Sequence, residues 1–290
     1  MAPHRLIRII ALAAASVLAF SACSSDNGSG STDGLTEDQK AVQAVVRASL
    51  DAENAADAAA FLALWTDTGL ESYDVGSRDE LLAGENPDFG SEDFEIVAFG
   101  DTTVTADAAT VVVDAARQGA SFAKPIFRVT FDAVRTEGAW LLDGFEFLGG
   151  PPPAAGTEVV DIEGKEYAFA VAKTEFSGDV AFRFTNAGTE QHEISFYKGP
   201  DGIDLLSAKA ALENVDGSEL TDLPEGYQAE HIAFTEPGGS QDIVFADPLA
   251  SGTYIFTCYI PEGGFGEQGP VNPEGKAHIQ LGMISVITVT

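Results

Sequence analysis

The C-terminal half of the sequence takes its fold from Gly252-Thr253-Tyr254-Ile255-Phe256-Thr257-Cys258, which is separated from His278 by 19 residues; four more lie between His278 and Met283. Five consecutive β-branched or aromatic residues predict a strand that ends at the cysteine. The sequence has only two cysteines and two methionines. One of each therefore falls next to a predicted strand end, which makes this segment a candidate for metal chemistry.

A further histidine, His192, lies upstream in Asn186-Ala187-Gly188-Thr189-Glu190-Gln191-His192, between two predicted strands. A thiolate, two imidazoles and a weak thioether together favour copper, and a trigonal site of two imidazoles and one thiolate suits both of its oxidation states. His231 has no partner at metal-ligand spacing, and we interpret it as an ordinary strand residue.

Residues 157–290 resemble a cupredoxin of the plastocyanin or azurin type, in which the first histidine comes from an early loop and the other three ligands come from one loop between the last two strands. The resemblance implies an all-β Greek-key sandwich that binds one copper ion. Cys258 would be the thiolate, His192 and His278 the equatorial imidazoles, and Met283 the axial ligand. It also implies cycling between Cu(I) and Cu(II), with electrons passed to an unknown redox partner protein.

The sequence departs from this family in two places. The insertion 259–277 is long and rich in Gly and Pro, and we expect it to loop outward so that its ends still meet. It could instead cover the site, add Glu262 as a ligand or open a coordination position. Glu193 follows His192 where relatives often have a small polar residue, which would change the surroundings of the thiolate. A metal-free sandwich, with Cys258 and Met283 as packing residues, is the plain alternative.

The metal site is expected to have a docking surface for its redox partner. Ile279, Leu281 and Gly282 are apolar and flank the second histidine. We expect them to form a collar around an exposed edge of His278.

Residues 35–148 begin with helical patterns and continue with strand patterns. Thr36 with Gln39, and Ser77 with Glu80, form capping boxes, and Asp57 is a further candidate helix cap. Strands are expected at 94–99, 110–114, 126–134 and 139–147. Helices followed by an antiparallel sheet favour an α+β domain.

The segments 55–61 and 138–144 in this part of the chain resemble the nuclear transport factor two fold, which SnoaL and ketosteroid isomerase share. That resemblance implies an α+β cone of helices on a curved antiparallel sheet. The region contains no His, Cys or Met and one tyrosine, Tyr73. We interpret Asp57 as a cap and Asp143 as a turn residue, and we assign no catalytic residue here.

Two linkers divide the sequence. Residues 23–34 form a polar tether, and residues 149–156 are a Pro/Gly linker that can continue neither a helix nor a central strand. The second domain, 157–290, is expected to have many short strands, at 159–162, 167–171, 180–185, 193–197, 232–234, 240–245, 253–258 and 283–290. A polar and partly helical excursion at 204–230 interrupts them.

Residues 1–22 have a basic start and an apolar run that is too short for a comfortable membrane span, which is typical of a secretion signal. Phe20-Ser21-Ala22-Cys23 resembles a bacterial lipobox, which implies that Cys23 is lipidated and becomes the mature N-terminus. The alternative is an ordinary cleavage site with an incidental cysteine. The expected location is the outer face of the bacterial cell membrane.

The chain is strongly acidic, with 46 Asp and Glu against 15 Lys and Arg and a formal net charge of −31. Such a surface repels phosphate backbones, so we expect no nucleic-acid partner. The sequence predicts an exported, lipid-anchored copper-binding protein that transfers single electrons and is not an enzyme. Two alternatives stay open. One is a copper carrier or sensor without redox turnover. The other is a small-molecule-binding protein that uses the pocket of 35–148 and has a metal-free structural cupredoxin domain.

Overall fold

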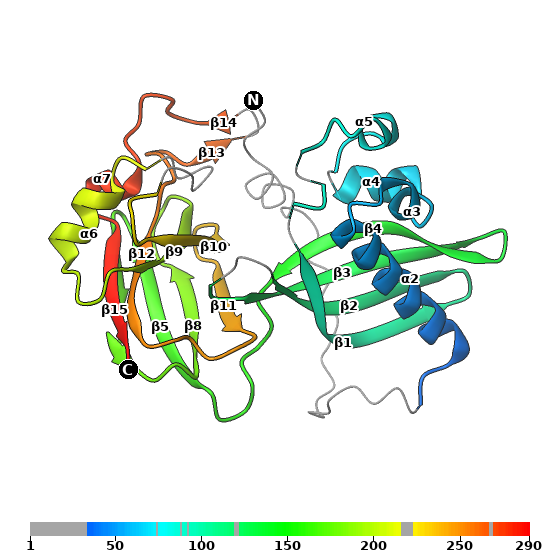
Figure 1. Ribbon diagram of the computed structural model, residues 1–290, viewed down its shortest axis with the longest axis horizontal. Coiled ribbons are helices and arrows are strands. Elements are labelled where there is room, and N and C mark those ends of the chain that lie inside the picture. The colour runs from blue at the N-terminus through cyan, green and yellow to red at the C-terminus, as the bar shows by residue number, and fades with distance from the viewer. Residues whose placement is uncertain are drawn as a thin grey trace. The chain divides into compact units, whose positions relative to one another are not determined.

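The computed structural model in Figure 1 describes residues 34–290 except 74, 88, 92, 119–121, 216–222 and 267–268, and it leaves the side chain of His231 undescribed. The predicted signal peptide and Cys23 lie outside these residues. The described chain is rich in sheet, has few helices, and divides into two compact units. One unit comprises residues 34–118 and 127–148, and the other comprises residues 122–126 and 149–290.

The helices of the first unit begin where their caps predict. The Thr36–Gln39 capping box is present at the start of the first helix, the Ser77–Glu80 box is present at the last, and Asp57 accepts a hydrogen bond from Ala60 N. All three caps are thereby confirmed. The helices are α2 (Glu37–Asn54), α3 (Ala58–Leu62), α4 (Asp67–Tyr73) and α5 (Arg78–Ala83).

Four strands follow, and they pair in the order β1-β2-β3-β4. Their bounds are β1 (Phe94–Thr105), β2 (Ala108–Arg117), β3 (Pro125–Thr136) and β4 (Ala139–Gly149). The strand predicted at 126–134 is present as β3, in which Phe131 and Ala133 are buried whereas Asp132 between them is exposed. An aromatic cluster fills the space between helices and sheet: Phe61, Trp65, Tyr73, Phe89, Phe131 and Phe145. Asp143 accepts a hydrogen bond from Thr66 Oγ1 at 2.5 Å.

The second unit contains two packed sheets, with strand orders β11-β8-β5-β6 and β10-β9-β12-β15-β7. Both sheets are mixed, since β5–β8 and β15–β7 are parallel pairs and the other pairs are antiparallel. The bounds are β5 (Glu158–Lys165), β6 (Ala168–Val171), β7 (Glu175–Phe176), β8 (Val180–Asn186), β9 (His192–Gly199), β10 (Gln228–Thr235), β11 (Ser240–Phe245), β12 (Gly252–Thr257) and β15 (Ile284–Val289).

The core between these sheets is aromatic. Phe182 of one sheet meets Phe256 of the other edge-on, with ring centroids 5.2 Å apart, and Phe196 stacks on Phe256 at 5.3 Å. All three side chains are fully buried. Aromatic side chains of this size supply much of the apolar area that holds two sheets together, so the sheet positions near the candidate ligands are well fixed.

Two short helices and one small hairpin complete this unit. Helix α6 (Leu205–Leu212) begins after the cap Asp204 and lies within the predicted, partly helical excursion 204–230. Figure 1 shows α6 and the short helix α7 (His278–Leu281) beside β15. The insertion forms the hairpin β13 (Phe265–Gly266) and β14 (Gly269–Pro270). None of the helices in the described ranges is long and apolar enough to cross a membrane.

Residues 122–126 belong to the second compact unit, although they lie within the first predicted domain, 35–148. Pro125 and Ile126 pair with the end of β11, and Lys124 forms an ion pair with Asp247 at 2.7 Å. Phe122 packs on Phe196 with ring centroids 5.6 Å apart. These contacts place the segment in the second unit, although it lies 30 residues or more before position 156, where the predicted linker ends.

Candidate metal centre

Three ligand-type side chains from distant parts of the sequence meet at one end of the second unit. His192 is the first residue of β9, Cys258 directly follows β12, and His278 is the first residue of α7. Strands β9 and β12 are neighbours, with Ser195 opposite Thr257. Because β12 pairs with β15, the segment just before β15 lies next to Cys258. The Cys258 carbonyl accepts a hydrogen bond from Ile279 N, the residue after His278, at 2.7 Å.

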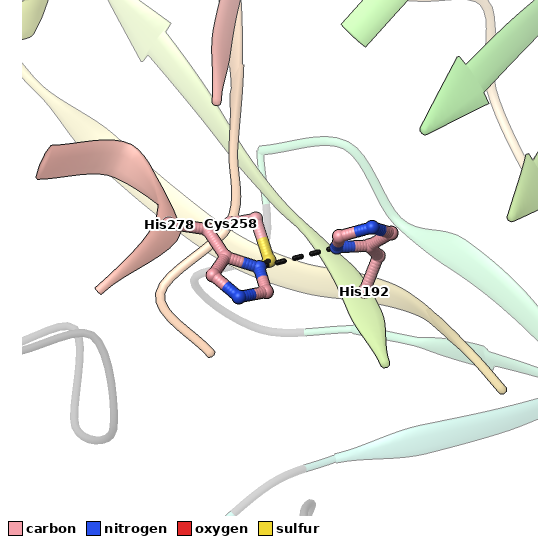
Figure 2. A group of neighbouring side chains, drawn as sticks. All are labelled: His192, Cys258 and His278. Carbon is pink, nitrogen blue, oxygen red and sulfur yellow. Dashed lines mark hydrogen bonds between the residues drawn. The ribbon is translucent and has the colours of Figure 1, made fainter. Parts of the chain in front are cut away.

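The donor atoms of these side chains converge, as Figure 2 shows. Nδ1 of His192 lies 3.1 Å from Nδ1 of His278, and Sγ of Cys258 lies 3.4 Å from that same nitrogen. Ligand atoms of all three residues lie within 4.8 Å of one another, and all three side chains are fully buried. Metal–nitrogen bonds of about 2.0 Å and metal–sulfur bonds of about 2.3 Å put ligand atoms of one ion roughly 3.2–3.6 Å apart. The three residues therefore fit a single metal ion.

Met283 lies in the same buried cluster as Cys258 and Ile260. Its amide nitrogen donates to the His278 carbonyl at 2.9 Å, and its carbonyl accepts from Cys258 N at 3.3 Å. A β carbon at Gly164 would lie 3.2 Å from the Met283 methyl carbon, so the glycine leaves room for this side chain. The structure thus brings all four predicted ligand residues together at one end of the sandwich.

Glu193 contributes to the surroundings of the thiol, as its place directly after His192 led us to expect. Its backbone N–H points at Cys258 Sγ, with a separation of 3.4 Å. Its buried carboxylate accepts a hydrogen bond from Tyr259 N at 2.9 Å. Glu193 thus contacts the sulfur through its own backbone N–H. Through its side chain it holds the backbone of Tyr259, the residue that follows the cysteine.

The two histidines have different partners on their far sides. His278 Nε2 lies 3.0 Å from Glu190 Oε2, and the Tyr167 ring covers the imidazole, with ring centroids 4.8 Å apart. His192 Nε2 is buried and has no hydrogen-bond partner among the described residues. Nothing in the sequence singles out Glu190 or Tyr167, since Tyr167 lies more than 100 residues before His278.

Burial keeps the metal-free donors uncharged at neutral pH. It raises the pKa of the Cys258 thiol well above its usual value. It lowers the pKa of His192 to about 4, with a smaller contribution from His278, and it lowers the pKa of His278 against the opposing effect of Glu190. For Glu190, burial would raise the pKa, but hydrogen bonds from Gly263 and His278 outweigh it and lower the pKa overall.

The insertion is closed at its base, as expected of a loop whose ends meet. Glu262 N donates to the Lys276 carbonyl at 3.0 Å, and Pro261 forms a bridge with Ala277. The Glu262 carboxylate accepts from Lys276 N at 3.1 Å, and Glu262 is not part of the converging group that the described residues form.

The loop before His192 also contacts the insertion. Glu190 Oε2 accepts from Gly263 N at 2.8 Å, and Gln191 Oε1 accepts from Phe265 N at 2.7 Å. The insertion is therefore attached to the early ligand loop, next to the candidate centre.

The predicted apolar collar is wrong in its main features. Ile279 is fully buried and packs with Leu212 and Ile255 in the core beneath α6. The imidazole of His278 is also fully buried, so it presents no exposed edge. The reason is tertiary: α6 covers Ile279, while Tyr167 and Glu190 cover the ring.

Comparisons with known proteins give no family for this chain. No family model matches the sequence, and no curated protein matches it. Among solved structures it is similar to auracyanin B, with 21% identity over 49% of this chain and 92% of that one and a TM-score of 0.29. Dithionite-reduced auracyanin from Roseiflexus castenholzii is 29% identical over 47% of this chain and 99% of that one, with a TM-score of 0.26. An NTF-2-like protein of unknown function from Shewanella oneidensis is 12% identical over 38% of this chain and 98% of that one, with a TM-score of 0.31.

Proposed function

We propose that the protein binds one copper ion at His192, Cys258, His278 and Met283 and transfers single electrons through it. The observation that carries the proposal is the convergence of two imidazole Nδ1 atoms and one thiol sulfur, at 3.1 and 3.4 Å, from three separate parts of the chain. Met283 lies beside the thiol in the same buried cluster.

The chemistry of the donor set selects the metal and the reaction. Two imidazoles and one thiolate with a weak axial thioether are the donors of copper electron-transfer sites. When bound, copper would supply a one-electron Cu(II)/Cu(I) couple. The protein's own contribution is to hold the four side chains on paired strands and to bury them, so that their positions change little when the charge changes.

The fold class that we propose follows from the same arrangement. The second unit, with two packed sheets and ligands in the order His, Cys, His and Met, is proposed to be a cupredoxin sandwich. The first unit, with helices followed by a four-stranded sheet, is proposed to be a nuclear transport factor two-like cone. Its interior is packed with aromatic side chains, and we assign it no catalytic group.

We further propose that Cys23 anchors the exported protein by a lipid to the outer face of the bacterial membrane, where it meets a redox partner protein. The lipobox-like segment before Cys23 and the polar residues after it support the anchor. Globomycin treatment of the expressing cells should leave the precursor unprocessed. Unchanged processing would contradict the anchor.

The copper proposal is tested by adding Cu(II) to the full chain and recording visible absorption, electron paramagnetic resonance and voltammetry. We expect a strong thiolate-to-copper charge-transfer band that disappears in Cys258→Ser and persists in the matched control Cys23→Ser. A band without a reversible couple would support a copper carrier or sensor and contradict electron transfer. Absence of the band in the parent protein would contradict the thiolate-bound copper site.

A further inference from the structure

Glu190 lies at the junction of three parts of the candidate centre. One carboxylate oxygen, Oε2, lies 3.0 Å from His278 Nε2 and also accepts a hydrogen bond from Gly263 N at 2.8 Å. The other oxygen, Oε1, accepts from the Tyr167 hydroxyl at 3.3 Å. One acidic side chain thus contacts a candidate ligand, the insertion and the ring that covers the ligand.

These contacts determine which nitrogen of His278 carries a proton. A carboxylate only accepts hydrogen bonds, so the imidazole nitrogen that faces Glu190 must be the one that bears hydrogen. In the neutral ring the other nitrogen, Nδ1, then has a free lone pair. That nitrogen is the one directed at Cys258 Sγ and His192 Nδ1.

The second histidine has no comparable group. His192 Nε2 has no hydrogen-bond partner among the described residues and faces Gly188, where an added β carbon would lie 2.9 Å away. Among the described residues, His278 is therefore the candidate imidazole ligand that has a carboxylate hydrogen-bonded to its outer nitrogen. An outer carboxylate makes the imidazole that it contacts a stronger donor and favours the more highly charged metal ion.

We propose that Glu190 is a positioning residue that holds His278 in its Nε2–H tautomer and, through that imidazole, favours Cu(II) over Cu(I). The second part of this inference rests on the proposed function, whereas the tautomer does not. The expected consequence is a lower reduction potential than the four ligand residues would give alone.

Three substitutions in the full chain separate this role from general acidity. Glu190→Gln removes the charge but keeps an oxygen that can accept the hydrogen bond from Gly263 N. Glu190→Ala removes both the charge and the acceptor. Glu262→Gln is the matched control, since it removes an equal charge from the insertion that Glu190 contacts, while the Glu262 carboxylate accepts from Lys276 N.

The tautomer is measured on the copper-free protein by long-range proton–nitrogen correlation NMR with ¹⁵N-labelled histidine. We expect His278 to be Nε2–H in the parent, Glu190→Gln and Glu262→Gln, and a mixture of tautomers in Glu190→Ala. An Nδ1–H tautomer in the parent would overturn the proposal whether or not the chain binds copper. If the alanine variant fails to fold, the parent spectrum still decides the matter.

The effect on the metal is measured by voltammetry of the copper-loaded proteins. Loss of an outer partner of a metal ligand typically weakens metal binding 10- to 100-fold. We expect Glu190→Gln to lower the ratio of Cu(II) to Cu(I) affinity at least tenfold, which raises the potential by about 59 mV for one electron. Glu262→Gln should give less than half of that shift. Equal shifts in the two variants would show a general charge effect and overturn the role of Glu190, whereas failure of every variant and the parent to bind copper would contradict the proposed function instead.

Discussion

Gly188 is a position where a single added methyl group should disturb the metal centre. A β carbon there would lie 2.9 Å from His192 Nε2 and 2.9 Å from Glu166 Cδ, whereas ordinary van der Waals contact begins near 3.4 Å. The Glu166 carboxylate receives a hydrogen bond from Glu190 N at 3.2 Å, so it is attached to the same loop. Gly188→Ala must therefore displace the imidazole, the carboxylate or the loop.

The size of the effect follows from these two contacts and from a still closer one with Glu166 Oε1. They require movements of at least about 0.5 Å at side chains that the surrounding structure holds, and overpacking of this kind costs about 1–3 kcal/mol. If that free energy acts on the geometry of the donors, copper binding weakens roughly 5- to 150-fold. Stability of the copper-free protein should fall within the same range.

The assay combines urea unfolding of the copper-free chain with a copper competition titration. Gly266→Ala is the matched control, because it lies in the insertion next to the centre and its β carbon would lie 3.5 Å from Val271 Cγ2, the nearest atom among the described residues. We expect the control to stay within about 0.5 kcal/mol of the parent. Parent-like stability and copper affinity in Gly188→Ala would refute the close approach of Gly188 to His192.

Three further predictions concern protons and the first unit. Burial raises the pKa of the Cys258 thiol and lowers the pKa of both ligand histidines, so copper uptake at pH 7 should release about one proton, the one from the thiol. Calorimetry in two buffers of different ionisation enthalpy measures the number of protons released. Release of zero or two protons would contradict the neutral donor set. The backbone N–H of Thr189 lowers the pKa of Glu166 to about 2, so the stabilisation from this carboxylate is present above about pH 4.3 and is lost as the pH falls through 2. After allowance for solvent screening, Glu166→Gln should lower the free energy of unfolding by about 1 kcal/mol relative to the parent, and this loss should be constant above pH 5 and disappear near pH 2. A loss that persists at pH 2 would show that the charge of Glu166 is not its cause. Ser49→Ala should lower the free energy of unfolding in urea by about 1–3 kcal/mol. The reason is that the buried Trp65 indole N–H donates to Ser49 Oγ at 2.8 Å and would lose this acceptor. A loss under about 0.5 kcal/mol would contradict that account.

Local signals in the sequence predicted most of the helices and strands. The Thr36–Gln39 and Ser77–Glu80 capping boxes mark the starts of two helices, because a cap depends on residues three positions apart. Phe182 and Phe184 are buried while Arg183 is exposed, because successive side chains of a strand point to opposite faces. Helix α4 was not predicted, although the Thr66 hydroxyl directly before it accepts a hydrogen bond from Gly69 N at 3.0 Å in the manner of a helix cap.

The sequence by itself determined the inventory and chain order of the candidate donors, and the structure places those four residues together. Only the tertiary structure decided what surrounds them. Glu190 and Tyr167 reach His278 because two sheets and an insertion pack at one end of the unit, and α6 buries Ile279 where a collar was expected. Such contacts join residues some 70 to 110 positions apart, and their distances are set by the packing of whole elements, which no local period in the sequence encodes.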